Sequence, residues 1–235
     1  MIALIDMDLV VFRAAASAEN DPFSIAVHRA EETLDNLLKK VNATEYKAYL
    51  SSSTNFRKKI YPEYKAHRNP VKPIHLKAMQ EYALEFMGAI TSPEGLEADD
   101  MLGIEQDKST LTTTICSLDK DLLQIPGNHF SWEIGTKTWT RPDTWLTQTE
   151  LEGYRLLYQQ AIKGDATDNI KGIPGKGKVF AEKVLKDCQS EKEMFDVVRE
   201  QYSNDEEFLQ NAGCVWILRQ HGETFAERFK QLASF

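Results

Sequence analysis

The chain has 235 residues, of which 42% are hydrophobic and 27% are charged, as in an ordinary globular protein with a sizeable core. No apolar run approaches the roughly 18 residues that a membrane span requires, and no signal peptide is recognisable at the N-terminus. Three distant cysteines without a CxxC pair predict reduced thiols and a cytoplasmic protein. The formal net charge of -8 argues against nucleic-acid binding by itself, so the distribution of charge has to decide.

The first half of the chain alternates between short apolar segments and segments of helical periodicity. Ile2–Ile5 is apolar without alternation, as in a strand buried on both faces. The segments that follow are predicted, in chain order, as a helix at 22–40, a strand at 46–50, a basic segment at 55–72, helices at 74–87 and 97–106, and a strand at 112–118. Strands that alternate with helices predict an α/β fold with a mostly parallel sheet.

The remainder of the chain changes character. Residues 129–139 are predicted as a hairpin around Gly135, because turn residues interrupt a run of strand formers. Helical patterns then continue to the end of the chain. We therefore divide the chain into a core, residues 1–146, and a helical lobe, residues 147–235, which has a Gly-rich break at 164–177.

Four clusters of acidic residues lie at predicted strand ends or helix starts. They are Asp6 with Asp8, Glu97 with Asp99 and Asp100, Asp119 with Asp121, and Asp165 with Asp168. Sites in parallel sheets form where the strands end, so these carboxylates are expected to meet there. Crowded carboxylates repel one another unless a cation neutralises them, and their hard oxygen atoms suit Mg²⁺ or Mn²⁺. So many acids predict two ions, although each cluster alone could merely cap a helix.

The basic segment at 55–72 combines cations with aromatic residues. Six cations stand against the single acid Glu63, and they are Arg57, Lys58, Lys59, Lys65, Arg68 and Lys72. The residues interleaved with them are Phe56, Tyr61, Tyr64 and His67. This mixture suits a single nucleic-acid strand, held by phosphate contacts and base stacking. The alternative interpretation is a solvated surface helix.

The Gly-rich break, DNIKGIPGKGKVFAEKVL, resembles a helix–hairpin–helix motif. Its glycines permit a tight turn that presents backbone N–H groups at the start of a helix, where a DNA phosphate can bind. Three lysines surround the turn, and they are Lys171, Lys176 and Lys178. The alternative is an ordinary Gly/Pro loop before a helix, but the G-I-P-G-x-G spacing favours phosphate binding.

Together these motifs resemble those of one family, the 5′-nucleases. This family includes bacteriophage 5′-to-3′ exonucleases, flap endonucleases and the 5′-nuclease domain of bacterial DNA polymerase I. LIDMDLVVFR resembles the first metal-binding strand, FRKKIYPEYKAHR the helical arch, LEADD and SLDKDL the central acidic motifs, and GDATDNIKGIPGKGKVFAEKVL the last acids with a helix–three-turn–helix. The match runs in order over most of the chain, and the DKD variant with the small size suggests the phage branch.

The resemblance implies a fold and a set of residue roles. The fold would be a PIN-like, mostly parallel sheet flanked by helices, with a helical arch at about 55–72 and a helix–three-turn–helix in the C-terminal lobe. Two Mg²⁺ ions, for which Mn²⁺ can substitute, would lie among Asp6, Glu97, Asp99, Asp100, Asp119, Asp121, Asp165 and Asp168. The residues expected at the scissile phosphate are Lys65, Arg68 and Arg13. The other implied DNA contacts are Tyr64, which would stack on or pack against an end base, with Lys58, Lys59, Lys171, Gly172, Gly175, Lys176, Gly177 and Lys178.

The resemblance also implies an activity and its partners. The chain would be a metal-dependent 5′-to-3′ exonuclease and flap endonuclease, leaving a 5′-phosphate and a 3′-hydroxyl, in phage-type DNA replication or RNA primer removal. Its substrates would be duplex DNA with a 5′ end, a flap or a nick, and an RNA–DNA hybrid. K⁺ would bind at the Gly-rich turn, and a monomer in the cytoplasm, the host cytoplasm if phage-encoded, is expected.

One departure from the family pattern keeps two alternatives open. The family usually has another acid after its second strand, whereas this chain has LSSSTNF, with Ser52 as the best placement. Serine is a poor magnesium ligand, so a non-catalytic DNA-binding member of the fold is one alternative. The other is a phosphatase of the haloacid-dehalogenase type, in which Asp6 would be phosphorylated and Asp8 would be the acid/base. That class would leave the basic segment and the Gly-rich turn without a purpose.

Overall fold

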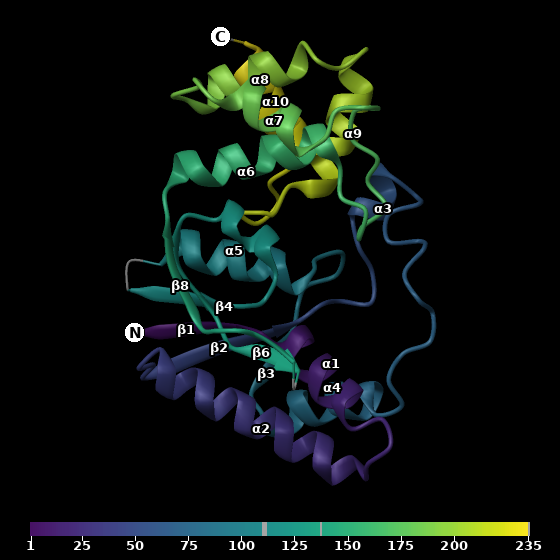
Figure 1. The fold of residues 1–235 in the computed structure, drawn as a ribbon, viewed down its shortest axis with the longest axis vertical. Coiled ribbons are helices and arrows are strands. Elements are labelled where there is room, and N and C mark those ends of the chain that lie inside the picture. Colours follow the sequence, from purple (N-terminus) through teal and green to yellow (C-terminus); the bar gives the residue numbers. More distant parts are fainter. Residues whose placement is uncertain (110–111, 137, 235) are drawn as a thin grey trace.

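The first strand of the chain is central in the main sheet. The computed structural model describes residues 1–109, 112–136 and 138–234. Within this part, every neighbouring pair in the main sheet is parallel except the last. In sheet order the strands are β3 (Ala89–Thr91), β2 (Glu45–Leu50), β1 (Ile2–Asp6), β4 (Thr113–Cys116), β5 (Gly127–Ser131) and β8 (Thr144–Gln148). The prediction of a mostly parallel sheet is confirmed (Figure 1).

β1 is buried on both faces, as its unbroken apolar sequence predicts. Ala3 and Ile5 belong to the hydrophobic cluster on one face of the sheet, whereas Leu4 belongs to the cluster on the other face. Successive side chains of a strand point to opposite faces, so a strand covered on both sides needs an apolar residue at each position. The run ends at Asp6, which places a carboxylate where the strand leaves the core.

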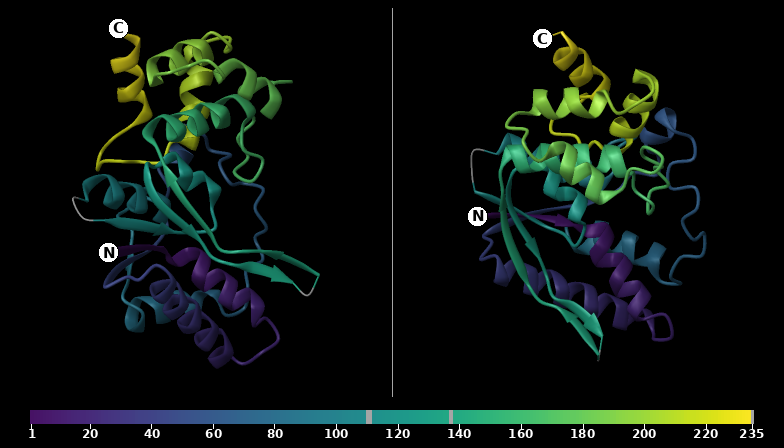
Figure 2. Two further views of the ribbon diagram at one scale, coloured as in Figure 1. Left: turned by 60° about the vertical axis from the view of Figure 1, so that its left-hand side comes forward. Right: turned by 45° about the horizontal axis from the view of Figure 1, so that its top comes forward.

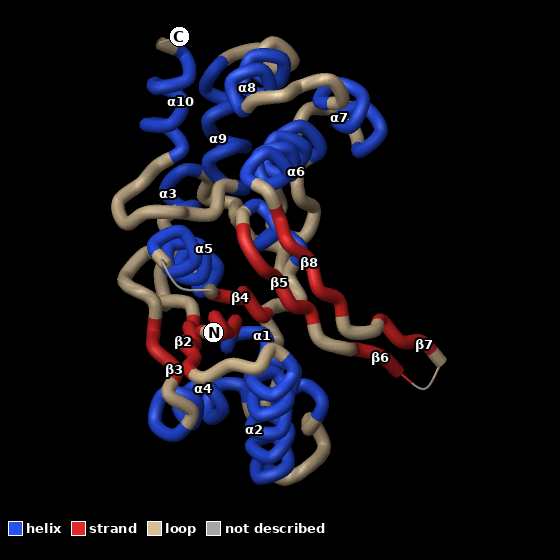
Figure 3. Tube along the Cα trace, turned by 90° about the vertical axis from the view of Figure 1, so that its left-hand side faces the viewer, coloured by secondary structure: helices blue, strands red, loops and turns tan. Residues whose placement is uncertain are grey.

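Helices cover both faces of this sheet (Figures 1 and 3). The helices on one face are α1 (Met7–Ser17), α2 (Phe23–Lys40) and α4 (Leu76–Phe86). Those on the other side are α5 (Ala98–Lys108), α6 (Glu150–Lys163), α7 (Lys178–Leu185), α8 (Glu191–Arg199), α9 (Asp205–Val215) and α10 (Phe225–Ala233), and a 3₁₀ helix, η1 (Lys120–Gln124), follows β4. No helix in the described ranges is long and apolar enough to cross a membrane.

The C-terminal helices share a hydrophobic cluster with the sheet. Leu102 of α5 and Ile115 of β4 belong to the same cluster as Tyr158 of α6 and the fully buried Trp216. The predicted boundary between residues 146 and 147 falls inside β8, and the core is continuous across it. Apolar burial therefore fixes the helical lobe against the sheet.

The basic segment does not form the helical arch that the sequence predicts. Only α3 (Arg57–Ile60) is helical, and turns and extended backbone follow up to residue 73. Pro62 and Pro70 explain the difference, because proline lacks the N–H that a continuing helix requires. Lys65 has a φ of 58°, which also breaks a helix, and its N–H donates to Asp168 O at 2.9 Å. The basic segment is thus fixed by a backbone hydrogen bond to the loop that contains Asp168.

The predicted hairpin is longer than expected and its glycine lies elsewhere. β5 and β8 continue outward as a two-stranded ribbon of β6 (Ile134–Thr136) and β7 (Trp139–Arg141), which projects from the body of the protein (Figures 2 and 3). Gly135 lies within β6, opposite Thr140, and not at the turn. A Cβ at Gly135 would lie 2.4 Å from Trp139 O, so glycine permits the close approach of the two strands.

The Gly-rich break forms a compact loop between α6 and α7. Gly164 ends α6 with a φ of 72°, and Gly172, with a φ of 64°, packs directly on it. Asp165 and Ile170 pair as a short antiparallel bridge between these two glycines. This contact joins the last two predicted acids to the turn at 172–177 in one unit.

Replacing Gly172 with alanine is expected to lower the free energy of unfolding by roughly 2–4 kcal/mol. The added Cβ would lie 2.3 Å from the Gly164 nitrogen, and that backbone atom cannot yield without breaking the bridge. Gly175→Ala is the matched control, because its φ is 75° but no atom lies within 4 Å of the new Cβ, so only backbone strain of about 1 kcal/mol is expected. Urea denaturation measures both, and equal losses would contradict the packing explanation.

Candidate active site

The site begins where three parallel strands end. Asp6 is 3% exposed, and it accepts hydrogen bonds from Leu9 N at 3.2 Å and from Ser117 Oγ at 2.7 Å. It therefore caps α1 and links the ends of β1 and β4. Asp8, two residues further, accepts the N–H of Ser51 at 3.0 Å, which links α1 to the end of β2.

Six of the eight carboxylates predicted as ligands line one hollow of about 90 Å³, which we call the acidic hollow. They are Glu97, Asp99, Asp119, Asp121, Asp165 and Asp168. Asp6 lies close enough to Asp99 for the two charges to repel each other. The clusters from four distant parts of the sequence are thus brought together at the carboxyl edge of the sheet.

Burial, together with the charges of neighbouring acids, raises the pKa values of Asp6, Asp99 and Asp121. Burial, with the charge of Asp8 next in importance, raises the pKa of Asp6 to about 7. Burial, followed by the charges of Asp119 and Asp165, raises the pKa of Asp121 to about 7. Burial and the charge of Asp6 also raise the pKa of Asp99 well above its ordinary value. The ionised forms are therefore costly without a nearby cation.

The donor set fits divalent cations that prefer oxygen ligands. Oδ1 of Asp121 is buried and has no hydrogen-bond partner in the described part of the chain, as is expected of an atom intended for a ligand. No group of three acidic, histidine or cysteine side chains within the described ranges is already arranged around a common metal position. Cationic side chains of the basic segment approach two of the acids instead.

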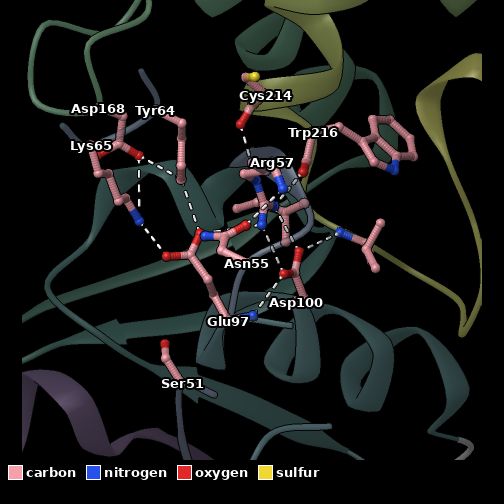
Figure 4. A network of polar contacts seen from close by, with 12 residues as sticks. Ser51, Asn55, Arg57, Tyr64, Lys65, Glu97, Asp100, Asp168, Cys214 and Trp216 are labelled. Atoms are coloured by element: carbon pink, nitrogen blue, oxygen red, sulfur yellow. Dashed lines mark hydrogen bonds and ion pairs between the residues drawn. The ribbon is translucent and has the colours of Figure 1, made fainter. Parts of the chain in front are cut away.

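Lys65 and Arg68 of the basic segment both line the acidic hollow, and Figure 4 shows Lys65 pointing toward Glu97 and Asp168. Lys65 Nζ lies 2.5 Å from Glu97 Oε1 and 3.6 Å from Asp168 Oδ2, and Arg68 Nη2 donates to Asp168 Oδ1 at 2.5 Å. Burial opposes ionisation of Glu97, but the charges of Arg57 and Lys65 outweigh it and lower its pKa to about 2. Both cations predicted to act at a phosphate thus face the acids.

Tyr64 also points into this network, but it is buried. Its hydroxyl lies 3.0 Å from Glu97 Oε2 and 2.9 Å from Asp168 Oδ2, and the side chain is only 2% exposed. Its ring packs in the main hydrophobic cluster and supports Lys65, whose ammonium lies 4.9 Å from the ring centroid. In this structure the ring has no free face for a nucleic-acid base, which differs from the expected stacking.

Asp100 is placed differently from the other predicted ligands. It is fully buried and lies outside the acidic hollow, where both of its oxygens are used by protein donors. Arg57 binds it through two N–H groups, at 2.9 and 2.7 Å, and the N–H groups of Glu97 and Leu218 complete its bonds. Asp100 therefore forms a structural ion pair here and has no oxygen left for a metal.

Arg57 connects three segments through a single buried guanidinium (Figure 4). Besides Asp100 it donates to Glu97 Oε2 at 3.2 Å, to Cys214 O at 3.0 Å and to Trp216 O at 2.6 Å. All five N–H donors of the side chain are thereby used. Sequence reasoning counted Arg57 only as one more cation of the basic segment. The capping box of Glu97 and Asp100 was the available signal that Asp100 faces inward.

The remaining predicted residues lie outside the acidic hollow. Lys58 and Lys59 are exposed on α3, and Arg13 is exposed on α1, where the Arg141 guanidinium lies nearby. Ser52 Oγ donates to Thr54 O at 2.7 Å and accepts the N–H of Gly95 at 3.2 Å, whereas Ser51 is the residue of this stretch that donates to Asp8.

The Gly-rich turn presents an open helix start. No atom lies within 4 Å of the positions that a Cβ would take at Gly175 or Gly177, so a ligand can approach the backbone there. Lys171 and Lys178 are exposed beside it, whereas Lys176 leans on Phe180 and donates to Gln201. Gly172 is buried in the base of the loop and acts there through packing.

The fold and the site together define an α/β protein whose parallel sheet ends in an acidic hollow, covered by a basic segment and joined to a Gly-rich loop. Residues 1–151 match the family model described as the 5′-3′ exonuclease, N-terminal resolvase-like domain. The chain belongs to this family.

Relatives and solved structures are consistent with this assignment. The chain is 33% identical to DNA polymerase I of Caldicellulosiruptor bescii over 153 residues, which is 59% of this chain and 18% of that protein. It is 27% identical to DNA polymerase I of Mycobacterium bovis over 217 residues, 84% of this chain and 24% of that protein. The chain thus spans about a quarter or less of these relatives.

Two solved structures share the fold. The bacteriophage T5 D15 flap endonuclease, in a complex with DNA and metal ions, has a TM-score of 0.69 at 18% identity, covering 99% of this chain and 98% of that one. The T5 D15 protein co-crystallised with metal ions has a TM-score of 0.65 at 19% identity, covering 91% and 88% of the two chains. The predicted fold is confirmed by these matches.

Proposed function

We propose that the chain is a metal-dependent 5′-nuclease that acts as a 5′-to-3′ exonuclease and flap endonuclease on DNA. The observation that carries the proposal is the acidic hollow, in which six carboxylates from three segments face Lys65 and Arg68. The family assignment and the T5 structures solved with metal ions and DNA support it. A haloacid-dehalogenase phosphatase is disfavoured, because Asp6 is buried and both of its oxygens accept hydrogen bonds.

The acidic and the basic residues of the acidic hollow would have different roles, metal binding and phosphate binding. Two divalent ions, when bound, would neutralise the carboxylates and polarise the scissile phosphodiester. The carboxylates that would hold these ions are those of Asp99, Asp119, Asp121, Asp165 and Asp168. Asp121 has an unpartnered oxygen. Asp6 lies near Asp99 and would add its charge. Lys65 and Arg68 would exchange their carboxylate partners for the phosphate and stabilise its developing charge. The products would carry a 5′-phosphate and a 3′-hydroxyl.

The proposal is tested with a 5′-labelled flap and a nicked duplex in a titration of Mg²⁺ and then of Mn²⁺. We expect cleavage that depends on the ion and stops on addition of EDTA. Binding of both DNAs without cleavage in either ion would favour the second candidate, a non-catalytic DNA-binding protein. That candidate is motivated by the stretch after β2, where an acid is expected but Ser52 stands and where Ser51 donates its N–H to Asp8.

Five finer assignments belong to the same proposal. Mg²⁺ would be the working ion, with Mn²⁺ as a substitute, and K⁺ would bind at the open Gly-rich turn. An RNA–DNA hybrid would be accepted, in keeping with primer removal during replication, and the protein would act as a monomer in the cytoplasm. Light scattering and cleavage of a hybrid substrate check the oligomeric state and the hybrid directly.

Lys65→Ala is expected to lower the cleavage rate by about 100-fold or more while weakening DNA binding by less than about tenfold. The ammonium lies inside the acidic hollow, so it acts where charge develops and adds little to the outer contact area. Single-turnover rates and equilibrium binding in EDTA separate the two effects. Lys58→Ala is the control, because it removes an exposed lysine from the same segment. Equal losses of rate and binding would remove the catalytic role.

A further inference from the structure

The β6–β7 ribbon projects from the body of the protein (Figure 2), and its Arg141 lies near Arg13 of α1. Trp139 and Arg141 are two residues apart in β7, so both side chains leave the same face of the ribbon. Ile134, opposite Arg141 in register, packs against the cluster that contains α1, so this face is turned toward that helix. We define the ribbon surface as Phe12 and Arg13 of α1 with Trp139 and Arg141 of β7.

Large aromatic rings on this surface are open to solvent. Trp139 is 55% exposed and Phe12 is 41% exposed, although a globular protein normally covers such rings. Trp145 on β8 is also exposed, but its ring packs on Phe130 with the centroids 4.7 Å apart, so it is already partnered. Trp139 has no comparable ring contact within the described ranges.

The two arginines of the ribbon surface lack an acidic partner. Neither guanidinium makes a hydrogen bond or an ion pair with another residue of the described part of the chain. By contrast, ion pairs with acidic side chains are made by Arg29, Arg57, Arg68 and Arg199. Partial burial and the like charge of Arg141 lower the pKa of Arg13. Two neighbouring unpaired cations are a feature that an anion would stabilise, and a phosphate backbone supplies such anions in series.

The ribbon surface is continuous with the acidic hollow. Arg141 lines a depression of about 200 Å³ together with Asp119, Lys120 and His129. Asp119 and Lys120 also line the acidic hollow, so the two concave regions share a wall. A strand whose phosphate lies in the acidic hollow can therefore continue past Lys120 toward Arg141.

We propose that the ribbon surface binds an unpaired stretch of the DNA strand that leaves the acidic hollow, with phosphates on Arg13 and Arg141 and a base stacked on Trp139. The exposed ring requires a base with an open face, which favours a single strand over a duplex. The paired cations favour a polyanion over an apolar protein partner. The proposal rests on the proposed nuclease function for the identity of its ligand.

The test compares a fluorescent duplex that carries a single-stranded 5′ overhang with the same duplex ending bluntly. Anisotropy titrations of the full chain in EDTA measure binding without cleavage. Trp139→Ala and Arg141→Gln are each expected to raise the Kd for the overhang DNA about tenfold and to leave the Kd for the blunt DNA within about twofold. Arg141→Gln should also reduce the slope of log K against log salt by about one.

Lys39→Gln is the matched control, because it removes one exposed positive charge from α2, outside the ribbon surface. It should leave the Kd for the overhang DNA and the Kd for the blunt DNA unchanged. Equal weakening toward both DNAs, or unchanged binding of the overhang DNA by both variants, would overturn the proposal. Because no cleavage is measured, these outcomes are independent of the nuclease assay. A protein that binds as expected but never cleaves would refute only the nuclease function.

Discussion

Asp121→Asn is expected to reduce cleavage in Mg²⁺ by at least about 1,000-fold while DNA binding in EDTA is retained. Asparagine keeps the shape of the side chain but removes the charge and one acceptor from the acidic hollow. Oδ1 of Asp121 is buried and has no hydrogen-bond partner in the described part of the chain, so the substitution would remove a proposed metal ligand without breaking a hydrogen bond at that atom. Single-turnover cleavage of a 5′-labelled flap measures the effect.

The same substitution should stabilise the protein when divalent ions are absent. The pKa of Asp121 is raised from its ordinary value of 3.8 to about 7, so folding favours the protonated carboxyl, and folding free energy is lost as the pH rises from about 4 to about 7. At about pH 8 in EDTA we expect Asp121→Asn to gain on the order of 1–3 kcal/mol, and this gain should shrink as the pH falls below about 7 and largely vanish at about pH 4. Opposite signs for stability and activity distinguish a ligand from a structural acid.

Asp35→Asn provides the control for charge, since Asp35 is exposed on α2. It should alter neither cleavage nor stability beyond about 0.5 kcal/mol. Undiminished cleavage by Asp121→Asn in Mg²⁺ would rule out its role as a ligand. A loss of stability in EDTA at about pH 8 would show that its carboxylate has a structural partner.

Arg57→Met is expected to destabilise the protein by about 3–5 kcal/mol, the largest effect on stability that we foresee. The substitution leaves the carboxylate of Asp100 buried without its partner and frees two carbonyl oxygens at the end of α9. Arg57→Met combined with Asp100→Leu should recover most of that loss, because an apolar pair of similar volume removes the buried charge. Urea denaturation measures both variants.

The double variant separates stability from positioning. Even when folded, it should cleave at least about tenfold more slowly, because Glu97 loses one of the groups that orient it and the basic segment loses its anchor. Lys192→Met is the control, since it breaks an exposed ion pair and should cost less than about 1 kcal/mol. Full activity in the double variant would show that Arg57 matters only for folding.

The sequence predicted the sheet and the meeting of the acids for identifiable reasons. The unbroken apolar run of β1 can only be a strand covered on both faces, and parallel strands place their ends on one edge. Asp6 and Asp119 therefore had to approach each other, whatever the loops do between them. The Gly-rich turn was also predictable, because positive φ angles at Gly164 and Gly172 leave few other residues possible there.

The parts that could not be predicted depend on contacts between distant segments. Whether Asp100 faces a metal or an arginine depends on where α3 packs, because Arg57 of α3 binds it. The hydrophobic periodicity of the sequence does not predict where α3 packs. The basic segment was predicted as helical from its resemblance, yet its shape is set by prolines and by the backbone bond from Lys65 to Asp168. Tyr64 was expected to stack on or pack against an end base, but its ring is buried in the main hydrophobic cluster.

The packing of Gly172 on Gly164 has a consequence for where a substrate would be cut. The loop that carries Asp165 and Asp168 and the turn that would hold a phosphate are one rigid piece, and the core runs without a break from the sheet into the helical lobe. A duplex gripped at the turn would thus be held at a constant number of nucleotides from the acids. The packing of Gly172 on Gly164 would therefore fix the distance, in nucleotides, between the bound duplex and the bond that is cleaved.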